Sequence, residues 1–369
     1  GRKDFIDCVN LDGWTVDFIS ARRLGLGKYK VGEKEKGYNS RFGVEPIENI
    51  GWYGPDNGLK QMLSCTAAHF DTGYKLNQWA WVTNCWEISL VPQVKNLPVL
   101  SNSSSIVSTV GSGAGLKADF GAGLWEGGPI GIPYVVLAPG QPKVDVTFEY
   151  ADESDPGGYP VPANPPIEGG PDGAGDRHIL MVEPAECRLY ELYSAYPDGD
   201  GTWSAGSGAI WDLRSNAQRP LGWTSADAAG LAILPGLVRY DEVAAGKVEH
   251  AIRMTVPLSR RTYLWPASHY ASSSTDPNRP AMGERFRLKA SVDESTFPVQ
   301  VRPIIVALKT YGAIVADNGS AWYLSGVPDE RWDNTQLRAL ATIKGSDFEA
   351  IDGSGLRITT DSGEARPLP

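Results

Sequence analysis

Long apolar runs are missing from this chain of 369 residues, and so are clusters of basic side chains. No stretch approaches the roughly 18 apolar residues of a transmembrane helix, so we expect no membrane span. The chain has 34 Lys and Arg against 44 Asp and Glu, and its most basic run, "ARRLGLGKYKVGEKEKG", is interrupted by Gly and Glu. Because binding a phosphate backbone requires a positive surface, we expect no nucleic-acid partner.

Cysteine and histidine are also scarce, with four of each. Cys8, Cys65, Cys85 and Cys187 form no CxxC pair, and no spacing supports a metal site that uses His178, His250 or His269, so we expect no metal and no cofactor. Two disulfides are the preferred interpretation. Together with 12 Trp, 15 Tyr, 42 Gly and 27 Pro, the cysteines indicate a secreted, extracellular protein rich in turns.

Several catalytic motifs are absent. "GSGAI" lacks the G-x-S-x-G spacing of a nucleophile elbow, and no GK[ST] follows the glycines of "GLGKYKVGEKEKG", which excludes a phosphate loop. No HExxH occurs. No internal repeat of 20 to 50 residues is visible either, so propellers and solenoids are set aside. Any chemistry must therefore come from residues that the fold brings together.

Two regions differ in composition. Residues 1–96 carry three of the four cysteines and five tryptophans, and "NQWAWVTNCWEISLV" alternates in the manner of a strand. We expect this N-terminal segment to pack on a main domain that covers 97–369. The Ser-rich "VLSNSSSIVSTVGSGAG" between them is typical of a linker or of a loosely packed entry to the main domain.

The main domain shows frequent strand signals and little helix. Strands are predicted at "GIPYVVLA", "KVDVTFEYA", "RHILMVE", "CRLYELYSAY" and "GAIWDL". Helices are predicted at "RPIIVALKTYG", with Pro303 at its start and Gly312 at its end, and at "DNTQLRALATI", with Asp333 as N-cap. This pattern predicts a mainly β fold, an antiparallel β-sandwich or jelly-roll-like domain with a few helices near the C-terminus.

The candidate catalytic residues are mostly carboxylates in irregular segments. "DESDPGGYPVPANPPIEGGPDGAGD" is too rich in Pro and Gly for helix or central strand, and long loops of this kind are often functional. It contains Glu168 and ends at Asp176, two residues before His178, where a carboxylate can orient an imidazole for acid–base work. Asp212, Asp227 and Asp241 complete the candidates for a pair of facing carboxylates. The alternative for each is a turn, a cap or an ordinary hydrogen-bonded pair.

Aromatic side chains could bind a sugar, because Trp and Tyr offer flat apolar surface with a polar handle. The candidates for substrate binding are Trp203, Trp211, Trp223, Trp265, His269 and Tyr270. The alternative is that these aromatics belong to the core.

The stretch "GWTSADAAGLAILPGLVRYDEV", residues 222–243, crowds carboxylates among small residues that permit close backbone approach. We expect it to run beneath the long loop, with Asp227 or Asp241 facing Asp176 and His178. The alternative is that Asp227 caps a turn and that Asp241 pairs with Arg239 or Arg253 at the surface.

From about residue 100 onward the chain resembles an uncharacterised family of secreted bacterial proteins. The resemblance rests on "GIPYVV", "DESDPGGYP", "IEGGP", "GDRH", "AGSGAIWDL", "GWTSADAAG", "ILPGLVRYDEV", "RFRLKAS" and "ADNGSAWYLSG", and residues 1–96 lie outside it. It implies secretion and one continuous main domain. It implies no activity and no catalytic residue.

Two functions of different classes follow from the sequence. The first is a secreted carbohydrate-active enzyme, a polysaccharide hydrolase or lyase with paired carboxylates in an aromatic-lined groove, whose partner is a glycan. The second is a non-enzymatic extracellular protein that binds glycans or belongs to a surface assembly.

Overall fold

The computed structural model describes residues 30–31, 44–45 and 92–366. Backbone proximity divides the chain into two compact units, one made of Gly1–Trp86, Ala138–Gly140 and Glu183–Cys187, and the other of Glu87–Leu137, Gln141–Val182 and Arg188–Pro369. In the first unit, strands β1 (Lys30–Val31) and β2 (Val44–Glu45) pair antiparallel. The predicted strand at 77–91 and the packing of the N-terminal segment lie outside the described residues. Three of the four cysteines do too, so the disulfides stay a prediction.

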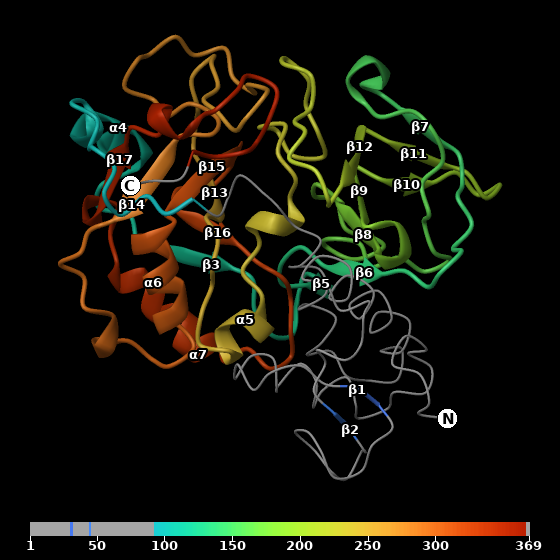
Figure 1. The fold of residues 1–369 in the computed structure, drawn as a ribbon, viewed down its shortest axis with the longest axis horizontal. Helices are drawn as coiled ribbons and strands as arrows, with labels where there is room; N and C mark the ends of the chain where they lie inside the picture. Colours follow the sequence, from blue (N-terminus) through green and yellow to red (C-terminus); the bar gives the residue numbers. More distant parts are fainter. Residues whose placement is uncertain (1–29, 32–43, 46–91, 367–369) are drawn as a thin grey trace. The chain divides into compact units, whose positions relative to one another are not determined.

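The second unit contains a six-stranded sheet in the order β17-β14-β15-β13-β16-β3 (Figure 1). Its strands are β3 (Lys117–Asp119), β13 (Ile252–Val256), β14 (Arg285–Leu288), β15 (Ala313–Asn318), β16 (Tyr323–Ser325) and β17 (Phe348–Ile351). With the helices packed on it, we call this sheet the first lobe. Its core includes Ile252, Met254, Ile305 and Trp322, all inaccessible to solvent.

Three helices belong to the first lobe: α4 (Ser103–Val110), α6 (Arg302–Thr310) and α7 (Asn334–Leu337). Helix α4 packs against β17 and α6 against β14. The helix predicted at 302–312 is confirmed, and Gly312 follows it at a φ of +77° that favours glycine. Asp333 caps α7, where its carboxylate accepts from the amides of Thr335 and Gln336 at 2.8 and 3.2 Å.

The Ser-rich segment is not a linker, and this expectation was wrong. Residues 103–110 form helix α4, because Ile106, Val107 and Val110 lie on one side of it and are buried in the core of the first lobe. The hydroxyl of Ser103 accepts from the amide of Ala350 at 2.8 Å and so joins the helix to β17. The high serine content of this segment made the apolar face of α4 difficult to recognise in the sequence.

Residues 134–137, 141–182 and 188–212 of the second unit form a second lobe with its own core. A four-stranded sheet has the order β12-β9-β8-β6 and a three-stranded sheet the order β10-β11-β7. The strands are β6 (Tyr134–Val136), β7 (Val146–Phe148), β8 (Ile179–Glu183), β9 (Arg188–Tyr193), β10 (Tyr196–Pro197), β11 (Trp203–Ala205) and β12 (Ser207–Asp212). Val144, Val146 and Phe148 alternate along the predicted strand "KVDVTFEYA" and pack on this core.

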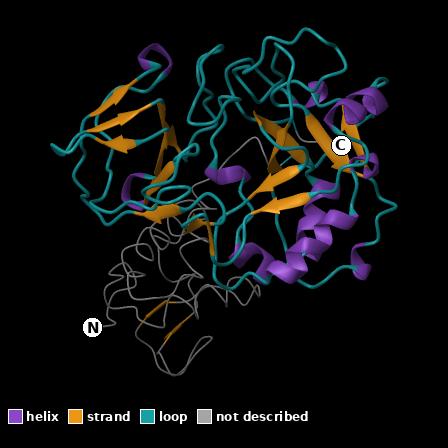
Figure 2. Ribbon diagram, turned by 180° about the vertical axis from the view of Figure 1, so that it is seen from behind, coloured by secondary structure: helices purple, strands orange, loops and turns teal. Residues whose placement is uncertain are grey.

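The remaining elements are short. They are the hairpin of β4 (Leu124–Trp125) and β5 (Gly128–Pro129), helix α5 (Tyr240–Ala244), and the 3₁₀ turns η5 (Ala151–Glu153), η6 (Pro184–Glu186), η7 (Leu234–Gly236), η8 (Glu294–Thr296), η9 (Arg338–Thr342), η10 (Gly345–Asp347) and η11 (Ser354–Leu356). Figure 2 shows that most helices gather around the six-stranded sheet, whereas the second lobe consists mainly of strands and loops.

The mainly β fold with a few helices near the C-terminus is confirmed, but the expected purely antiparallel pairing is not found. The pairs β13/β15, β3/β16, β6/β8 and β7/β11 are parallel, so the sheets are mixed rather than purely antiparallel. The period-two pattern reports which face of a strand is buried, and it carries no information on strand direction. Among the described residues, every helix is too short or too polar to cross a membrane.

Candidate functional site

The long loop is ordered by a buried arginine. Arg177 is 2% exposed and donates to the carbonyls of Pro171 and Gly173 at 2.8 Å each, and to that of Ala195 at 3.1 Å. A guanidinium can hold several carbonyls at once because its donors form a rigid fork. Arg177 therefore folds the loop back onto the start of β8 and fixes the residues on either side of it, Asp176 and His178.

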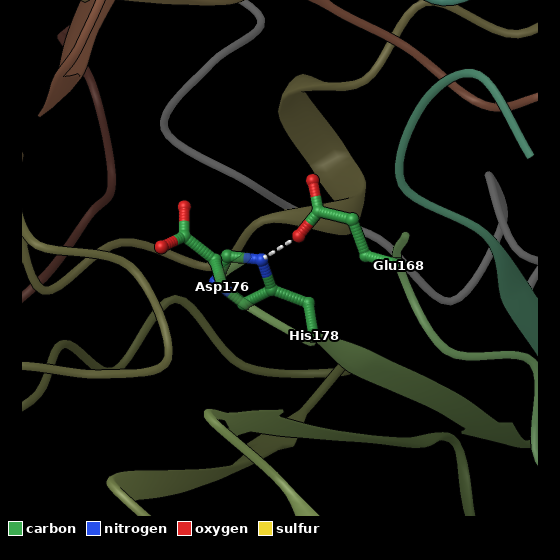
Figure 3. Close-up of side chains that lie close together, drawn as sticks. All are labelled: Glu168, Asp176 and His178. Carbon is green, nitrogen blue, oxygen red and sulfur yellow. Dashed lines mark hydrogen bonds and ion pairs between the residues drawn. The ribbon is translucent and has the colours of Figure 1, made fainter. Parts of the chain in front are cut away.

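His178 and Glu168 are joined through backbone and side chain. The amide of Glu168 donates to the carbonyl of His178 at 3.0 Å, and its Oε2 lies 2.5 Å from Nδ1 of His178 (Figure 3). The Nε2 of His178 lies 2.9 Å from the carbonyl oxygen of Ala226, which can only accept, so Nε2 carries a proton. This contact ties the long loop to the 222–243 stretch.

The pair is charged. Burial opposes a charged imidazole, but the Glu168 carboxylate outweighs it and raises the pKa of His178 to about 9. Burial likewise opposes a charged Glu168, yet the positive His178 outweighs it and the pKa of Glu168 falls below its usual value. Near neutral pH an imidazolium thus donates from Nδ1 to a carboxylate across the 2.5 Å contact.

The six-stranded sheet supplies the opposite side of the site. Four neighbouring strands each contribute one polar residue: Asp317 from β15, Arg253 from β13, Ser325 from β16 and Asp119 from β3. Ser325 and Asp119 are direct partners in the register of β16 and β3. Sheet register, rather than sequence proximity, brings Arg253, Ser325 and Asp119 into one row, with Asp317 beside it.

Arg253 is the centre of this row. It is 6% exposed and donates to Asp227 at 2.9 Å, to the hydroxyl of Ser325 at 2.8 Å and to Asp317 at 3.5 Å. Asp227 is 1% exposed, so the two form a buried ion pair. Asp227 therefore faces Arg253 instead of facing His178 across a cleft, although its neighbour Ala226 contacts His178.

Charges on the long loop and charges on the six-stranded sheet shift one another's pKa values. Burial raises the pKa of Asp317 to about 6, and the negative charges of Asp227 and Asp176 add to the shift. Desolvation also raises the pKa of Asp119, and the charge of Glu168 adds to it. We call Asp119, Glu168, Asp176, Asp227 and Asp317 the carboxylate cluster.

The carboxylate cluster is accessible on one side and buried on the other. Asp119 and Asp176 are exposed, and Glu168 and Asp317 keep 26% and 24% of their side-chain surface in solvent. Asp227, Arg253 and His178 form the buried layer beneath them. A substrate could therefore reach carboxylates whose positions are fixed by a buried layer of charge.

One subset could hold a cation. Glu168, Asp176 and His178 offer three ligand atoms that all lie within 4.8 Å of one another. In the charged pair described above, the proton on Nδ1 occupies the lone pair that a metal would need, so a cation would have to displace it. The arrangement as it stands is equipped for proton transfer.

Three aromatic rings border the cluster, and two of them were predicted. Tyr193 lies 5.7 Å from the ring of His178, and the charge of Asp176 helps to raise the pKa of its hydroxyl, after burial. His269 and Tyr270 are stacked at 5.6 Å, and His269 donates to the carbonyl of Ala228, next to Asp227. These two predicted residues are therefore close to the cluster.

The other predicted residues lie elsewhere. Asp212 forms an exposed pair with Arg214 at 3.0 Å, and Asp241 pairs with Arg331 at 2.7 Å on α5, so neither joins the cluster. Trp203 is buried in the core of the second lobe. Trp265 packs beside Val94 and donates to the carbonyl of Ser362. Local pairing or core packing engages these four outside the carboxylate cluster, which the sequence pattern could not distinguish from a shared groove.

Trp211 and Trp223 both lie close to one buried arginine. Arg219 is 5.7 Å from the Trp211 ring and 5.5 Å from the Trp223 ring, and it forms an ion pair with Asp155. Its Nε donates to the carbonyl of Thr224, which fixes the start of the 222–243 stretch. These tryptophans line an arginine network at a distance from the carboxylate cluster.

Three important residues were missed by the sequence patterns: Asp119, Arg253 and Asp317. Arg253 had a usable signal, because a charge in the middle of "AIRMTV" sits where a buried strand should be apolar. Asp119 and Asp317 follow apolar strand residues, as many turn aspartates do, and carry no distinguishing signal.

Comparison with known proteins finds one family model that matches part of the chain, and it indicates no activity. Residues 1–106 match the model of a family described as a domain of unknown function with a solved structure (DUF3863). No curated protein and no solved structure matches the chain. The family match lies on the N-terminal part of the chain, whereas the resemblance noted in the sequence begins near residue 100. The residues of the carboxylate cluster all follow the matched range.

Proposed function

We propose that this chain is a secreted carbohydrate-active hydrolase whose catalytic groups belong to the carboxylate cluster. One observation carries the proposal: two accessible carboxyl groups, Asp317 and Glu168, have pKa values shifted in opposite directions at one site. Glycosidic bond cleavage needs a protonated carboxyl as acid and an ionised carboxylate as base or nucleophile. The secreted setting is supported by composition and by the resemblance to secreted bacterial proteins.

Asp317 is the proton donor in this scheme. Its raised pKa keeps a large fraction protonated at mildly acidic pH, and it would protonate the oxygen of the leaving group. Glu168 stays ionised because His178 is positive beside it, and it would activate water or stabilise the positive sugar ring. Asp176 and Asp119 line the accessible side, where sugar hydroxyls could donate to them.

A glycan is the favoured substrate because of the rings beside these carboxylates. His269 and Tyr270 form a stacked, half-buried pair near Asp227, and Asn318, which follows Asp317, donates to the carbonyl of Ala271 at 2.8 Å. The aromatic pair is therefore linked to the strand that carries the proton donor. Flat rings beside carboxylates suit the apolar faces and hydroxyls of a sugar.

The test is turnover of polysaccharides. The full chain would be incubated with a panel of neutral and acidic polysaccharides between pH 4 and 8, and new reducing ends would be measured. We expect cleavage of at least one substrate, and we expect its rate to fall as the pH rises through about 6, where Asp317 loses its proton. Asp317→Asn and Glu168→Gln should each lower the rate by about 100-fold or more.

The control is Asp241→Asn, the same chemical change at a carboxylate that pairs with Arg331 outside the cluster. It should keep the wild-type rate, and thermal denaturation should show that all three variants are folded. If no polysaccharide is cleaved, or if both cluster variants stay within a few-fold of wild type, the proposed hydrolase is wrong.

A further inference from the structure

A cavity of about 230 Å³ lies away from the carboxylate cluster, at the far end of β12. Its wall includes Trp211 and Asp212 at the end of that strand, Arg188 opposite Asp212 on β9, and Ser215 and Gln218 from the following segment. Pockets for drug-sized ligands measure about 300 to 1,000 Å³. A cavity below this range accommodates a single small ring rather than an extended molecule.

Trp211 gives this cavity a fixed flat wall. Its ring nitrogen donates to the buried carboxyl of Glu191 at 3.1 Å, and the guanidinium of Arg219 lies 5.7 Å from its ring centre. Both contacts hold the indole in one orientation. A ring that is held before the ligand arrives costs little ordering entropy on binding, and Trp offers a flat apolar surface to the apolar face of a sugar.

The charges around the cavity favour a neutral ligand. Two carboxylates, Asp155 and Asp212, and two guanidinium groups, Arg188 and Arg219, line it and cancel one another. The donors of Arg219 are directed at Asp155 and at the carbonyls of Thr224 and Glu153, so this arginine does not offer its charge to an anion. Carboxylate, amide and hydroxyl groups on the remaining wall suit a ligand with several hydroxyls.

The cavity is separate from the carboxylate cluster but lies along the same pair of strands. In the register of β9 and β12, Tyr193 faces Ser207 and Leu189 faces Trp211. Tyr193 borders the cluster, so the Trp211 cavity is four residues further along, a distance of about 13 Å at the usual rise of a strand. Two such positions would contact different units of one extended chain.

We propose that the Trp211 cavity binds one neutral sugar unit of an oligosaccharide, at a subsite distinct from the carboxylate cluster. The choice of a carbohydrate as ligand class rests on the proposed function. The subsite itself rests on the cavity, the fixed indole and the balanced charge.

The test uses calorimetric titration of the full chain carrying Asp317→Asn, so that a bound chain is not cleaved. The probes are the β-1,4-linked hexasaccharides of glucose, xylose and mannose, with an oligogalacturonate as the acidic counterpart. We expect at least one neutral hexasaccharide to bind, and addition of Asp212→Ala to weaken that binding by about tenfold, because a charged acceptor of sugar hydroxyls is removed. The surface position of the Asp212–Arg214 pair keeps this variant folded.

The matched control is Asp352→Ala. Asp352 accepts from the amide two residues ahead at 2.9 Å, as Asp212 does at 3.0 Å, but it lies outside the cavity wall. It should leave affinity unchanged. The subsite is overturned if no neutral probe binds, if only the acidic probe binds, or if Asp212→Ala and Asp352→Ala behave alike.

The two proposals fail separately. Binding that depends on Asp212 in a protein that cleaves no polysaccharide would retain the subsite and reject the hydrolase. If cleavage depends on Asp317 but Asp212→Ala leaves the affinity for hexasaccharide unchanged, the hydrolase is retained and the subsite is rejected.

Discussion

At the scale of single residues, the molecule is distinguished by carboxyl groups that it keeps away from water. Glu191 is inaccessible to solvent and accepts from the amides of Ile233 and Leu234 and from the ring nitrogen of Trp211. Burial raises its pKa to about 7, and these hydrogen bonds only partly offset the shift. The folded protein therefore binds this proton more tightly than the unfolded chain does.

This difference predicts a pH dependence of stability. The contribution of the neutral carboxyl is complete below the ordinary pKa of 4.5 and is lost as the pH rises through about 7. The free energy of unfolding should fall by up to about 3 kcal/mol across this window on account of Glu191. Urea unfolding from pH 4 to 8 would measure it. In Glu191→Gln, which cannot titrate, the fall should be smaller by that amount, and equal pH profiles would contradict the assignment.

The buried pair of Asp227 and Arg253 predicts a second effect. Asp227→Asn removes the partner that lies 2.9 Å from a guanidinium with little access to water, and this should lower the free energy of unfolding by about 3 kcal/mol. Asp212→Asn breaks an exposed pair with Arg214 of similar length and should cost less than about 1 kcal/mol. Denaturant unfolding of both variants would measure the two losses of stability. Equal losses would show that burial does not make the Asp227–Arg253 pair more important than the exposed pair.

At the scale of elements, the ends of helices offer the sharpest comparison. Gly312 follows α6 with φ +77°, and Gly246 follows α5 with φ +82°. A Cβ at position 312 would meet the carbonyl oxygen of Phe286 at 2.6 Å, whereas a Cβ at position 246 would meet nothing within 4 Å. The two glycines thus share one backbone conformation but differ in the space beside them.

Alanine substitution should separate the cost of a left-handed backbone from the cost of a steric clash. Gly246→Ala should cost about 1 kcal/mol, the strain of a left-handed alanine. Gly312→Ala should cost at least about 1 kcal/mol more, because β14 must also move away. Thermal and urea unfolding of both variants would measure the difference. Equal losses of stability would show that the Phe286 carbonyl moves away from the new Cβ without a cost in free energy.

The same elements show how far sequence reasoning extends. Helix α6 was predicted because its start, apolar stripe and terminal glycine are neighbours in the chain. Glu168, Asp176 and His178 were predicted for the same reason, as they lie within eleven positions of one another. Asp119 and Asp317 were not, because only the register of β3, β16, β13 and β15 brings them to the site. Local signals identify half of such a site, and pairing between distant strands supplies the rest.

At the scale of the whole molecule, the two lobes have separate cores joined by polar contacts. Glu191 of β9 accepts from the amides of Ile233 and Leu234, His178 donates to Ala226, and Arg219 pairs with Asp155. Residues of the connecting stretch, such as Ala229 and Leu231, pack in the first lobe. These contacts should couple the lobes so that neither unfolds alone.

Large-to-small substitutions in each core test this coupling. Leu192→Ala in the second lobe and Ile305→Ala in the first each remove a fully buried side chain and should cost about 2–5 kcal/mol. Hydrogen exchange of the amides in β9 and α6 should report the same loss in both lobes for either variant. Protection lost in the mutated lobe alone would show that the lobes unfold independently.

The order of strands also has a consequence for synthesis. Strand β3 pairs with β16, and Lys117 and Tyr323 in that pair are separated by 206 positions, with the whole second lobe between them. At about 5 to 20 residues per second, a ribosome needs about 10 to 40 s to bridge that interval. During this time β3 has no partner strand. A nascent chain halted near residue 250 ends before β13, so it should hold β3 unpaired and the second lobe without its contacts to the first lobe, and both should become ordered only when the remaining strands of the sheet are made.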